Sequence, residues 1–199
     1  MSYFIEGLVL GCGLAISLGP IFITLTEASI DRGIKAGMTV GLGIWISDLI
    51  FIGVFYKFVN ILKDTIESPH FIFWMGLSGA IVLCLFGIYM IIKQPVIAFN
   101  NEKLTARNYI GYFTKGFMVN SINPFTFVYW MGVISTYMIG QNLPNISVQI
   151  VLFTILLVII ISDSAKVLLA NSLKSKLTPK VANYVFNLSG IILLSLIHI

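Results

Sequence analysis

The sequence predicts an all-α integral membrane protein with six transmembrane helices in two inverted three-helix repeats. Of its 199 residues, 58% are hydrophobic and only 10% are charged, and the mean hydropathy is +0.98. Soluble domains carry roughly 25% charged residues. Apolar runs recur along the chain, and each is close to the roughly 20 residues that a helix needs to cross a bilayer. A pair of matching motifs in the two halves predicts the repeat.

Six apolar runs are expected to cross the bilayer as helices. They occupy residues 3–26, 36–56, 71–92, 112–139, 148–169 and 181 onward. Barrel strands are not expected, because the runs lack alternating apolar and polar residues. No basic segment precedes the first run, so a cleavable signal peptide is not expected either. The runs predict a single transporter domain over 1–199, with repeat one at about 1–93 and repeat two at about 110–199.

The basic residues of the loops predict the orientation. Loops on one side carry Arg32, Lys35, Lys93, Lys103, Arg107, Lys115, Lys174, Lys176 and Lys180, and the other side carries Lys57 and Lys63. Basic loops stay in the cytoplasm, so both termini are expected outside. The net charge of +4 therefore reflects topology. A nucleic-acid partner is not expected, since the sequence has no basic, aromatic binding module.

Two short motifs occur once in each half. Ile46-Ser47-Asp48 in the second run recurs as Ile161-Ser162-Asp163 in the fifth. The first run of each half contains a helix breaker, which is Ser17-Leu18-Gly19-Pro20 in repeat one and Asn120-Ser121-Ile122-Asn123-Pro124 in repeat two. Three helices begin and end on opposite sides of a membrane, so the second half is expected to be inverted. Inverted repeats with Gly- or Pro-interrupted helices are typical of secondary transporters.

Asp48 and Asp163 lie deep in apolar runs. Each charge costs about 2.5–3.5 kcal/mol in a membrane helix on insertion scales, so each carboxylate is expected to face protein or water. Two interpretations stay open: a substrate or coupling group, or a structural hydrogen-bond acceptor between helices. Lys166, three residues after Asp163, is expected either to pair with it or to extend to the cytoplasmic surface.

The residues before Asp48 predict close helix packing. Gly33, Gly37, Gly41 and Trp45 are expected on the helix face of Asp48. Small residues on one face let a second helix approach closely. This face is therefore expected to turn Asp48 inward, and such glycine-rich faces also permit a homodimer. Trp45 and Trp130 are expected mainly to pack beside the cavity.

The proline breaks supply candidate binding groups. Pro124 removes one backbone donor and frees the carbonyl of Asn120. The amides of Asn120 and Asn123 offer donors and acceptors beside that gap, which suits a substrate with amino and carboxyl groups. The alternative is that they only repair the broken helix. Around Gly19 and Pro20 the corresponding polar groups are Ser17 and Thr24.

Three stretches carry a specific motif set. SLGPIFITLTEASIDRGIKAGMTVGLGIWISDLIFI contains Gly19-Pro20, Arg32-Gly33-Ile34-Lys35-Ala36-Gly37 and Ser47-Asp48; KGFMVNSINPFTFVYWMGV contains Gly116, Phe117, Asn120, Asn123 and Pro124; DSAKVLLANSLKSKLTP contains Asp163 and Lys166. Over nearly the whole chain these motifs resemble those of the lysine exporter (LysE) family of amino-acid translocators, with Leu18 where the family usually has a first proline. The resemblance implies six helices in inverted halves and export of amino acids or similar small metabolites.

We therefore expect a secondary exporter in a bacterial inner (plasma) membrane. Asp48 and Asp163 are expected to carry protons or hold an ammonium group. Asn120 and Asn123, with the breaks at Pro20 and Pro124, are expected to bind the polar head of the substrate. No ATP-binding loop is present, so an ion gradient or the membrane potential is expected to drive export. No enzymatic activity, cofactor or metal is expected.

Two alternatives remain at this point. A divalent-cation transporter on the same scaffold would need several converging acidic or His ligands. Only two deep acids are present in the sequence, which argues against this alternative without excluding it. A membrane redox or assembly protein would not need paired breakers and acids, and Cys12 and Cys84 form no CxxC motif.

The last six residues, Leu194-Ser195-Leu196-Ile197-His198-Ile199, resemble the translation of a transposon-derived sequencing adapter. We expect residues 194–199 to be a sequencing artefact, and we assign no role to His198.

The orientation can be tested by cysteine labelling in intact cells. A single cysteine at Asn142 is expected to react with an impermeant thiol reagent, and one at Asn108 is not, because both sites are expected in loops on opposite sides of the membrane. The reverse pattern would show that the termini lie in the cytoplasm.

Overall fold

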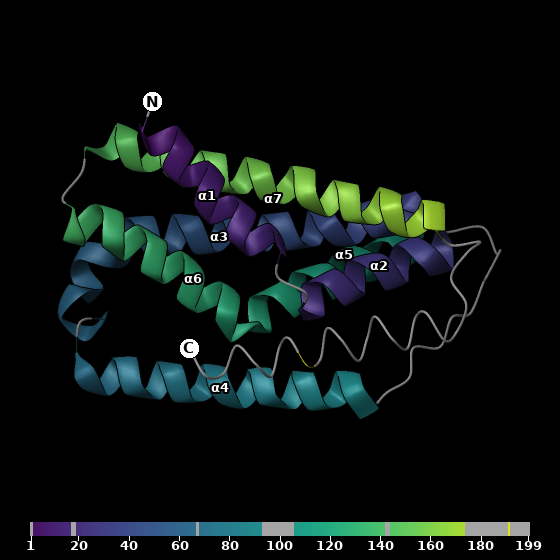
Figure 1. Ribbon diagram of the computed structural model, residues 1–199, viewed down its shortest axis with the longest axis horizontal. Coiled ribbons are helices and arrows are strands. Elements are labelled where there is room, and N and C mark those ends of the chain that lie inside the picture. The colour runs from purple at the N-terminus through teal and green to yellow at the C-terminus, as the bar shows by residue number, and fades with distance from the viewer. Residues whose placement is uncertain are drawn as a thin grey trace.

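A computed structural model describes residues 2–16, 19–66, 68–92, 106–141, 144–173 and 191 (Figure 1). Its helices are α1 (Ser2–Ile16), α2 (Pro20–Arg32), α3 (Ile34–Ile66), α4 (Pro69–Ile92), α5 (Ala106–Ile122), α6 (Pro124–Ser135), the π-helix η1 (Thr136–Gly140) and α7 (Asn145–Leu173). No strand occurs among these residues, so the predicted all-helical class is confirmed. Apart from residue 191, the predicted sixth span and the tail at 194–199 lie outside the described residues.

The exterior of the bundle and the length of its helices suit a membrane. Over Ile34–Val59 and Asn145–Leu173, α3 and α7 are each apolar and long enough to cross one. Together α1 and α2 would form a third span, bent by 69° between Ser2–Ala15 and Pro20–Arg32. Large apolar side chains project outward, and Val9, Ile61, Trp74 and Phe153 are each more than 60% exposed. An apolar surface of this kind is expected to contact lipid.

Two of the predicted spans are broken. The run at 3–26 corresponds to α1 followed by α2, and the run at 112–139 corresponds to α5, α6 and η1. In both cases the helix after the break begins at a proline, Pro20 or Pro124. Proline suits the first position of a helix because its missing N–H would have no partner there. In Figure 1 α1 lies alongside α7, and α4 lies along the edge of the bundle, where it contacts α3 and α6.

Several predicted boundaries were wrong. Arg107 and Asn108 lie in the first turn of α5, and Lys115 lies within that helix, although all three were expected in a loop. At their other ends α2 continues to Arg32 and α3 to Ile66. Hydropathy identifies the part of a helix that lipid surrounds, so it misses polar turns that extend beyond the lipid.

Gly33 was also misassigned. It was expected on the α3 face that carries Asp48, but it separates α2 from α3. Its φ of +86° is a backbone conformation that favours glycine, and its N–H donates to the carbonyl of Ser29 at 2.9 Å. Gly37 does provide close packing, since a Cβ there would lie 2.8 Å from Cγ1 of Val167 on α7.

The closest helix crossing joins α3 to α5. A Cβ at Gly43 would collide with the backbone carbonyl of Phe113, and a Cβ at Gly116 would collide with that of Val40. Each glycine therefore lets the backbone of the partner helix occupy the space of a side chain. The same device joins α1 to α7, where a Cβ at Gly11 would lie 2.8 Å from Cβ of Val158. Gly43 lies off the glycine-rich face that the sequence predicted.

The α3–α5 crossing can be tested with matched alanine substitutions. Gly43→Ala and Gly116→Ala are each expected to lower the free energy of unfolding by about 1–3 kcal/mol or more, because backbone atoms must move apart. Gly53→Ala on α3 and Gly111→Ala on α5 are the controls, since a Cβ at either would have no neighbour within 4 Å.

The measurement is unfolding of the purified protein in mixed detergent micelles. Equal stability of the four variants would show that α3 and α5 do not approach as closely as described.

Candidate functional site

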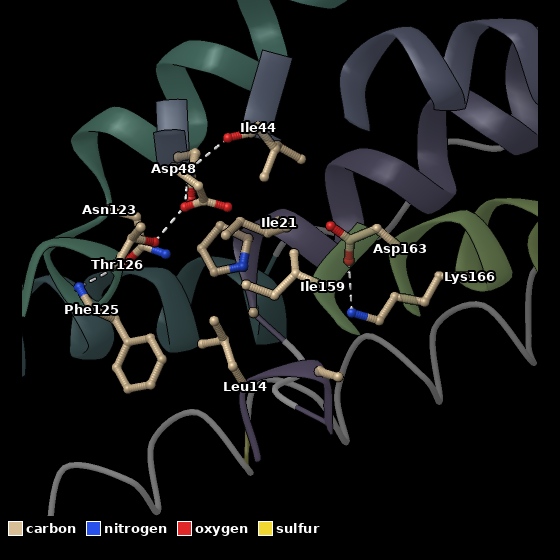
Figure 2. Close-up of a pocket in the computed structure, with 14 residues that line it drawn as sticks. Leu14, Ile21, Ile44, Asp48, Asn123, Phe125, Thr126, Ile159, Asp163 and Lys166 are labelled. Atoms are coloured by element: carbon tan, nitrogen blue, oxygen red, sulfur yellow. Dashed lines mark hydrogen bonds and ion pairs between the residues drawn. The ribbon is translucent and has the colours of Figure 1, made fainter. Parts of the chain in front are cut away.

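A small cavity lies between the two helix breaks (Figure 2). Its lining comes from six helices and comprises Leu14, Ala15, Gly19, Pro20, Ile21, Ile44, Asp48, Asn120, Asn123, Phe125, Thr126, Ile159, Asp163 and Lys166. In Figure 2 Asp48 and Asp163 lie on opposite sides of it, with Ile21 and Ile159 between them. The structure therefore brings all but one of the sequence-predicted site residues to one place, and Pro124 lies beside it as the neighbour of Asn123.

The first break positions Gly19 and Pro20 in the wall. Gly19 is the N-cap of α2 with an extended backbone (φ −118°, ψ −164°), and no side chain caps the helix there. Thr24 donates to the carbonyl of Pro20 at 2.7 Å, so its hydroxyl is bonded within α2. Ser17 and Leu18 lie outside the described residues. The N-terminus of α2 therefore forms part of the cavity lining and has no side-chain cap from the described residues.

The second break is capped by Asn123. Its Oδ1 accepts from the N–H of Phe125 at 3.1 Å, which is the usual role of an N-cap side chain. Its own N–H donates to the carbonyl of Asn120 at 3.2 Å, the carbonyl that Pro124 leaves without its helical partner. Asn123 therefore does repair the broken helix, and it also lines the cavity.

Asp48 is held by donors from the second half of the chain. Its side chain sits on α3 in a residue only 3% exposed. Oδ1 accepts from Nδ2 of Asn120 and from Nε1 of Trp130, both at 2.8 Å. Hydrogen bonds to a charged group contribute about 1.5–3 kcal/mol each. Two such bonds offset part of the cost of burying the carboxylate.

Asn120 uses both ends of its amide. Nδ2 donates to Asp48 and also to the carbonyl of Ile44 at 3.1 Å, and Oδ1 accepts from the hydroxyl of Thr126 at 2.9 Å. An Asn amide has two N–H donors, so both are occupied. Asn120 is fully buried. It acts here as a bridge that joins α3, α5 and α6.

Asp163 has a different set of partners. Oδ1 pairs with Nζ of Lys166 at 3.0 Å, and Oδ2 accepts from Nε1 of Trp45 at 3.2 Å. The side chain of Lys166 is 16% exposed. Of the two arrangements left open for Lys166, the structure shows the ion pair with Asp163. Each carboxylate oxygen of Asp163 is thus engaged, one of them by a cation.

Two of the three tryptophans, Trp45 and Trp130, contact a carboxylate of the opposite half. Trp45 of the first half donates to Asp163, and Trp130 of the second half donates to Asp48. The sequence favoured simple packing for these residues, and their indole N–H bonds were missed. Thr126 was missed as well. The available signal was that a buried indole needs an acceptor, and these helices carry few acidic residues.

Within the described ranges, no group of three or more His, Cys, Asp or Glu residues is placed to hold a metal ion. Cys12 and Cys84 are free cysteines.

Comparison with known proteins identifies the family. The model of the LysE type translocator family matches residues 12–196. The chain belongs to the LysE type translocator family. The resemblance seen in the motifs is therefore confirmed, and this LysE family member is a membrane translocator and not an enzyme. No solved structure matches the chain.

Individual relatives are more distant. The chain is 24% identical to YcgF of Bacillus subtilis (strain 168), which is provisionally named an amino acid efflux protein, over 98% of this chain and 92% of that protein. It is 26% identical to the threonine efflux proteins of Salmonella typhi and Salmonella typhimurium, over 63% of this chain and 61% of theirs.

The hydrogen bond from Trp130 to Asp48 can be tested by Trp130→Phe. This change is expected to lower the free energy of unfolding by about 1.5–3 kcal/mol, because the buried carboxylate loses one N–H donor. Trp74→Phe is the control, since Trp74 on α4 is 62% exposed. Unfolding is measured in mixed detergent micelles.

A double-mutant cycle with Asp48→Ala, which removes the acceptor, separates the hydrogen bond from the loss of ring volume. Additive effects of Trp130→Phe and Asp48→Ala would contradict the contact.

Proposed function

We propose that this LysE family member exports amino acids or closely related small metabolites from the bacterial cytoplasm, driven by an ion gradient or the membrane potential. The observation that carries the proposal is that both helix breaks and both deep carboxylates meet at one cavity. Secondary transporters place broken helices and ionisable groups at the substrate site in this way. The names of the relatives, which refer to amino acid and threonine efflux, support an amino acid as the substrate.

The proposed architecture is a single domain of six spans in two inverted halves. Each half begins with a helix broken before a proline, continues with a long helix that carries a Ser-Asp pair, and ends with a further span. In the first half these are α1 with α2, α3 and α4. In the second they are α5 with α6, α7 and the run from residue 181 onward. With the basic loops inside, both termini face the outside of the inner membrane. The glycine-rich helix faces permit a homodimer.

The volume of the cavity indicates how export would proceed. At about 50 Å³ it has room for a few water molecules, which need roughly 10–15 Å³ each. Even a small amino acid needs more space than this, so we infer that the walls separate to admit one. Export would therefore alternate between states open to each side of the membrane, with the two halves of the chain moving relative to one another.

Polar contacts join the two halves toward either end of the bundle. Glu27 on α2 pairs with Lys115 on α5 at 2.8 Å, on the side expected to be cytoplasmic. Glu6 on α1 accepts from the hydroxyl of Tyr137 on η1 at 2.9 Å, on the side expected to be outside. We infer that the first contact opens for substrate entry and the second opens for release.

The substrate class is tested by counterflow in proteoliposomes. Purified protein is reconstituted, loaded in turn with each of the twenty amino acids, and supplied with the same labelled amino acid outside. Accumulation of label with at least one amino acid is expected. Absence of exchange for all twenty, with correctly inserted protein, would refute amino acid transport.

Imposed pH gradients and potassium diffusion potentials then distinguish a proton gradient from the membrane potential as the driving force.

The roles of the carboxylates are tested by Asp48→Asn and Asp163→Asn. Each variant is expected to lose export while still inserting in the membrane, because an amide cannot carry a proton or balance an ammonium charge. Efflux is measured from preloaded cells, and membrane content by immunoblot.

Asp64→Asn, at the exposed end of α3, is the matched control and is expected to export normally. Full export by both test variants would make the two carboxylates structural.

A further inference from the structure

One oxygen of Asp48 has no partner among the described residues. Both hydrogen bonds that its carboxylate accepts, from Asn120 and Trp130, end on Oδ1. Oδ2 accepts none from the described part of the chain. The residue is 3% exposed and lines the cavity, so this oxygen is buried beside the open volume. A buried carboxylate oxygen without a donor costs free energy unless a ligand or water supplies one.

Asn123 likewise has one unused end. Its orientation is set by the bond from the N–H of Phe125, which requires the oxygen of the amide and leaves the NH₂ group on the other side. Nδ2 donates to no acceptor within the described ranges. Asn123 is 7% exposed and lines the same cavity, and in Figure 2 it lies on the Asp48 side. The two asparagines therefore differ. Both ends of the Asn120 amide are bonded within the protein, whereas the NH₂ group of Asn123 has no acceptor among the described residues and is left for a ligand.

The charges of the cavity are also unequal. Asp163 is paired with Lys166, whereas Asp48 has no cation within 4.0 Å among the described residues. A buried anion is stabilised by a cation that also donates hydrogen bonds. An ammonium group has the positive charge and the N–H donors. Asn123 stands at the N-terminus of α6, where the helix dipole favours negative charge. Among the described residues, an anionic acceptor without a partner and an amide donor without a partner therefore line the same cavity, and the donor lies at a positive helix end.

We propose that Oδ2 of Asp48 and Nδ2 of Asn123 form a subsite for the backbone of an α-amino acid, with the α-ammonium on Asp48 and the α-carboxylate on Asn123. This assignment rests on the proposed function. Asn120 and Trp130 are positioning residues, because they hold Oδ1 and leave Oδ2 to the substrate. The subsite takes molecules that carry both a free amino and a free carboxyl group. Substrate side chains extend toward the apolar wall of Leu14, Ile21 and Ile159.

Asn123→Asp tests the subsite without removing the helix cap. Asp caps helices about as well as Asn, so α6 is expected to form. The variant replaces the donor NH₂ by a negative carboxylate oxygen, which repels a substrate carboxylate and accepts from a substrate amide. Asn145→Asp is the matched control, since Asn145 is exposed at the start of α7, away from the cavity. Both variants add one negative charge to the protein.

The probes are L-threonine and L-threoninamide, which differ only in that the amide lacks the carboxylate. If another of the twenty amino acids is exchanged faster in counterflow, that amino acid and its amide are used instead. Each competes with the labelled amino acid in counterflow. The wild type and Asn145→Asp are expected to bind the acid about tenfold or more tightly than the amide, the range of a charge-assisted hydrogen bond. Asn123→Asp is expected to reverse this order. A purely structural role for Asn123 would weaken both probes alike.

The outcomes separate the two proposals. Reversal in Asn123→Asp, with the order kept in Asn145→Asp, supports the subsite. Exchange that retains the wild-type order in Asn123→Asp overturns the subsite and leaves amino acid transport standing. Equal weakening of acid and amide also overturns it, since it assigns Asn123 to the cap alone. Absence of exchange by the wild type for every amino acid overturns the proposed function and the subsite with it.

Discussion

Burial of the Asp48 carboxylate is the constraint on which the rest of this structure depends. An ionised group in the interior of a membrane protein must find donors, because lipid supplies none. The donors come from Asn120 on α5 and Trp130 on α6, in the opposite half of the chain. Asp163 on α7 meets the same requirement with Trp45 and Lys166. The need to satisfy two buried carboxylates therefore joins the halves at the place where both helix breaks face a cavity.

Glycine makes these contacts geometrically attainable. Gly43 immediately precedes Ile44, and Gly116 lies one turn before Asn120, so the close crossing of α3 and α5 is next to the bonds from Asn120 to Ile44 and Asp48. A side chain at either glycine would hold the backbones apart. The bonds from Asn120 span 2.8 to 3.1 Å and leave little room for such a shift. The crossing of α3 and α5 therefore provides both the close packing at the glycines and the hydrogen bonds of Asn120.

The two carboxylates have related positions in sequence and different chemistry in space. Lys166, one turn beyond Asp163, balances that carboxylate, and the corresponding position after Asp48 is Phe51, which packs against Phe55 and Phe127. Asp48 therefore has neutral donors, and one of its oxygens accepts no hydrogen bond from the described residues. The proposed subsite depends on this difference, because it places the ammonium group on the carboxylate that is not paired with Lys166.

Sequence by itself determined the membrane class, the broken helices, the family and all the polar side chains of the cavity lining except Thr126. These follow from local properties: apolar runs must enter lipid, proline cannot continue a helix, and deep charges must face inward. It misplaced Gly33 and the start of α5, because hydropathy records lipid contact and not backbone conformation. Only the tertiary structure decided that Gly43 lies at the crossing of α3 and α5, that Trp45 and Trp130 donate to the carboxylates, and that Lys166 pairs with Asp163. It also decided that both ends of the Asn120 amide are bonded, whereas Nδ2 of Asn123 has no acceptor among the described residues. Each of these contacts depends on which helix lies opposite and at what depth its side chains meet. A hydrogen bond of about 3 Å requires the two helices to be placed closely, and spacing along the chain does not determine that placement.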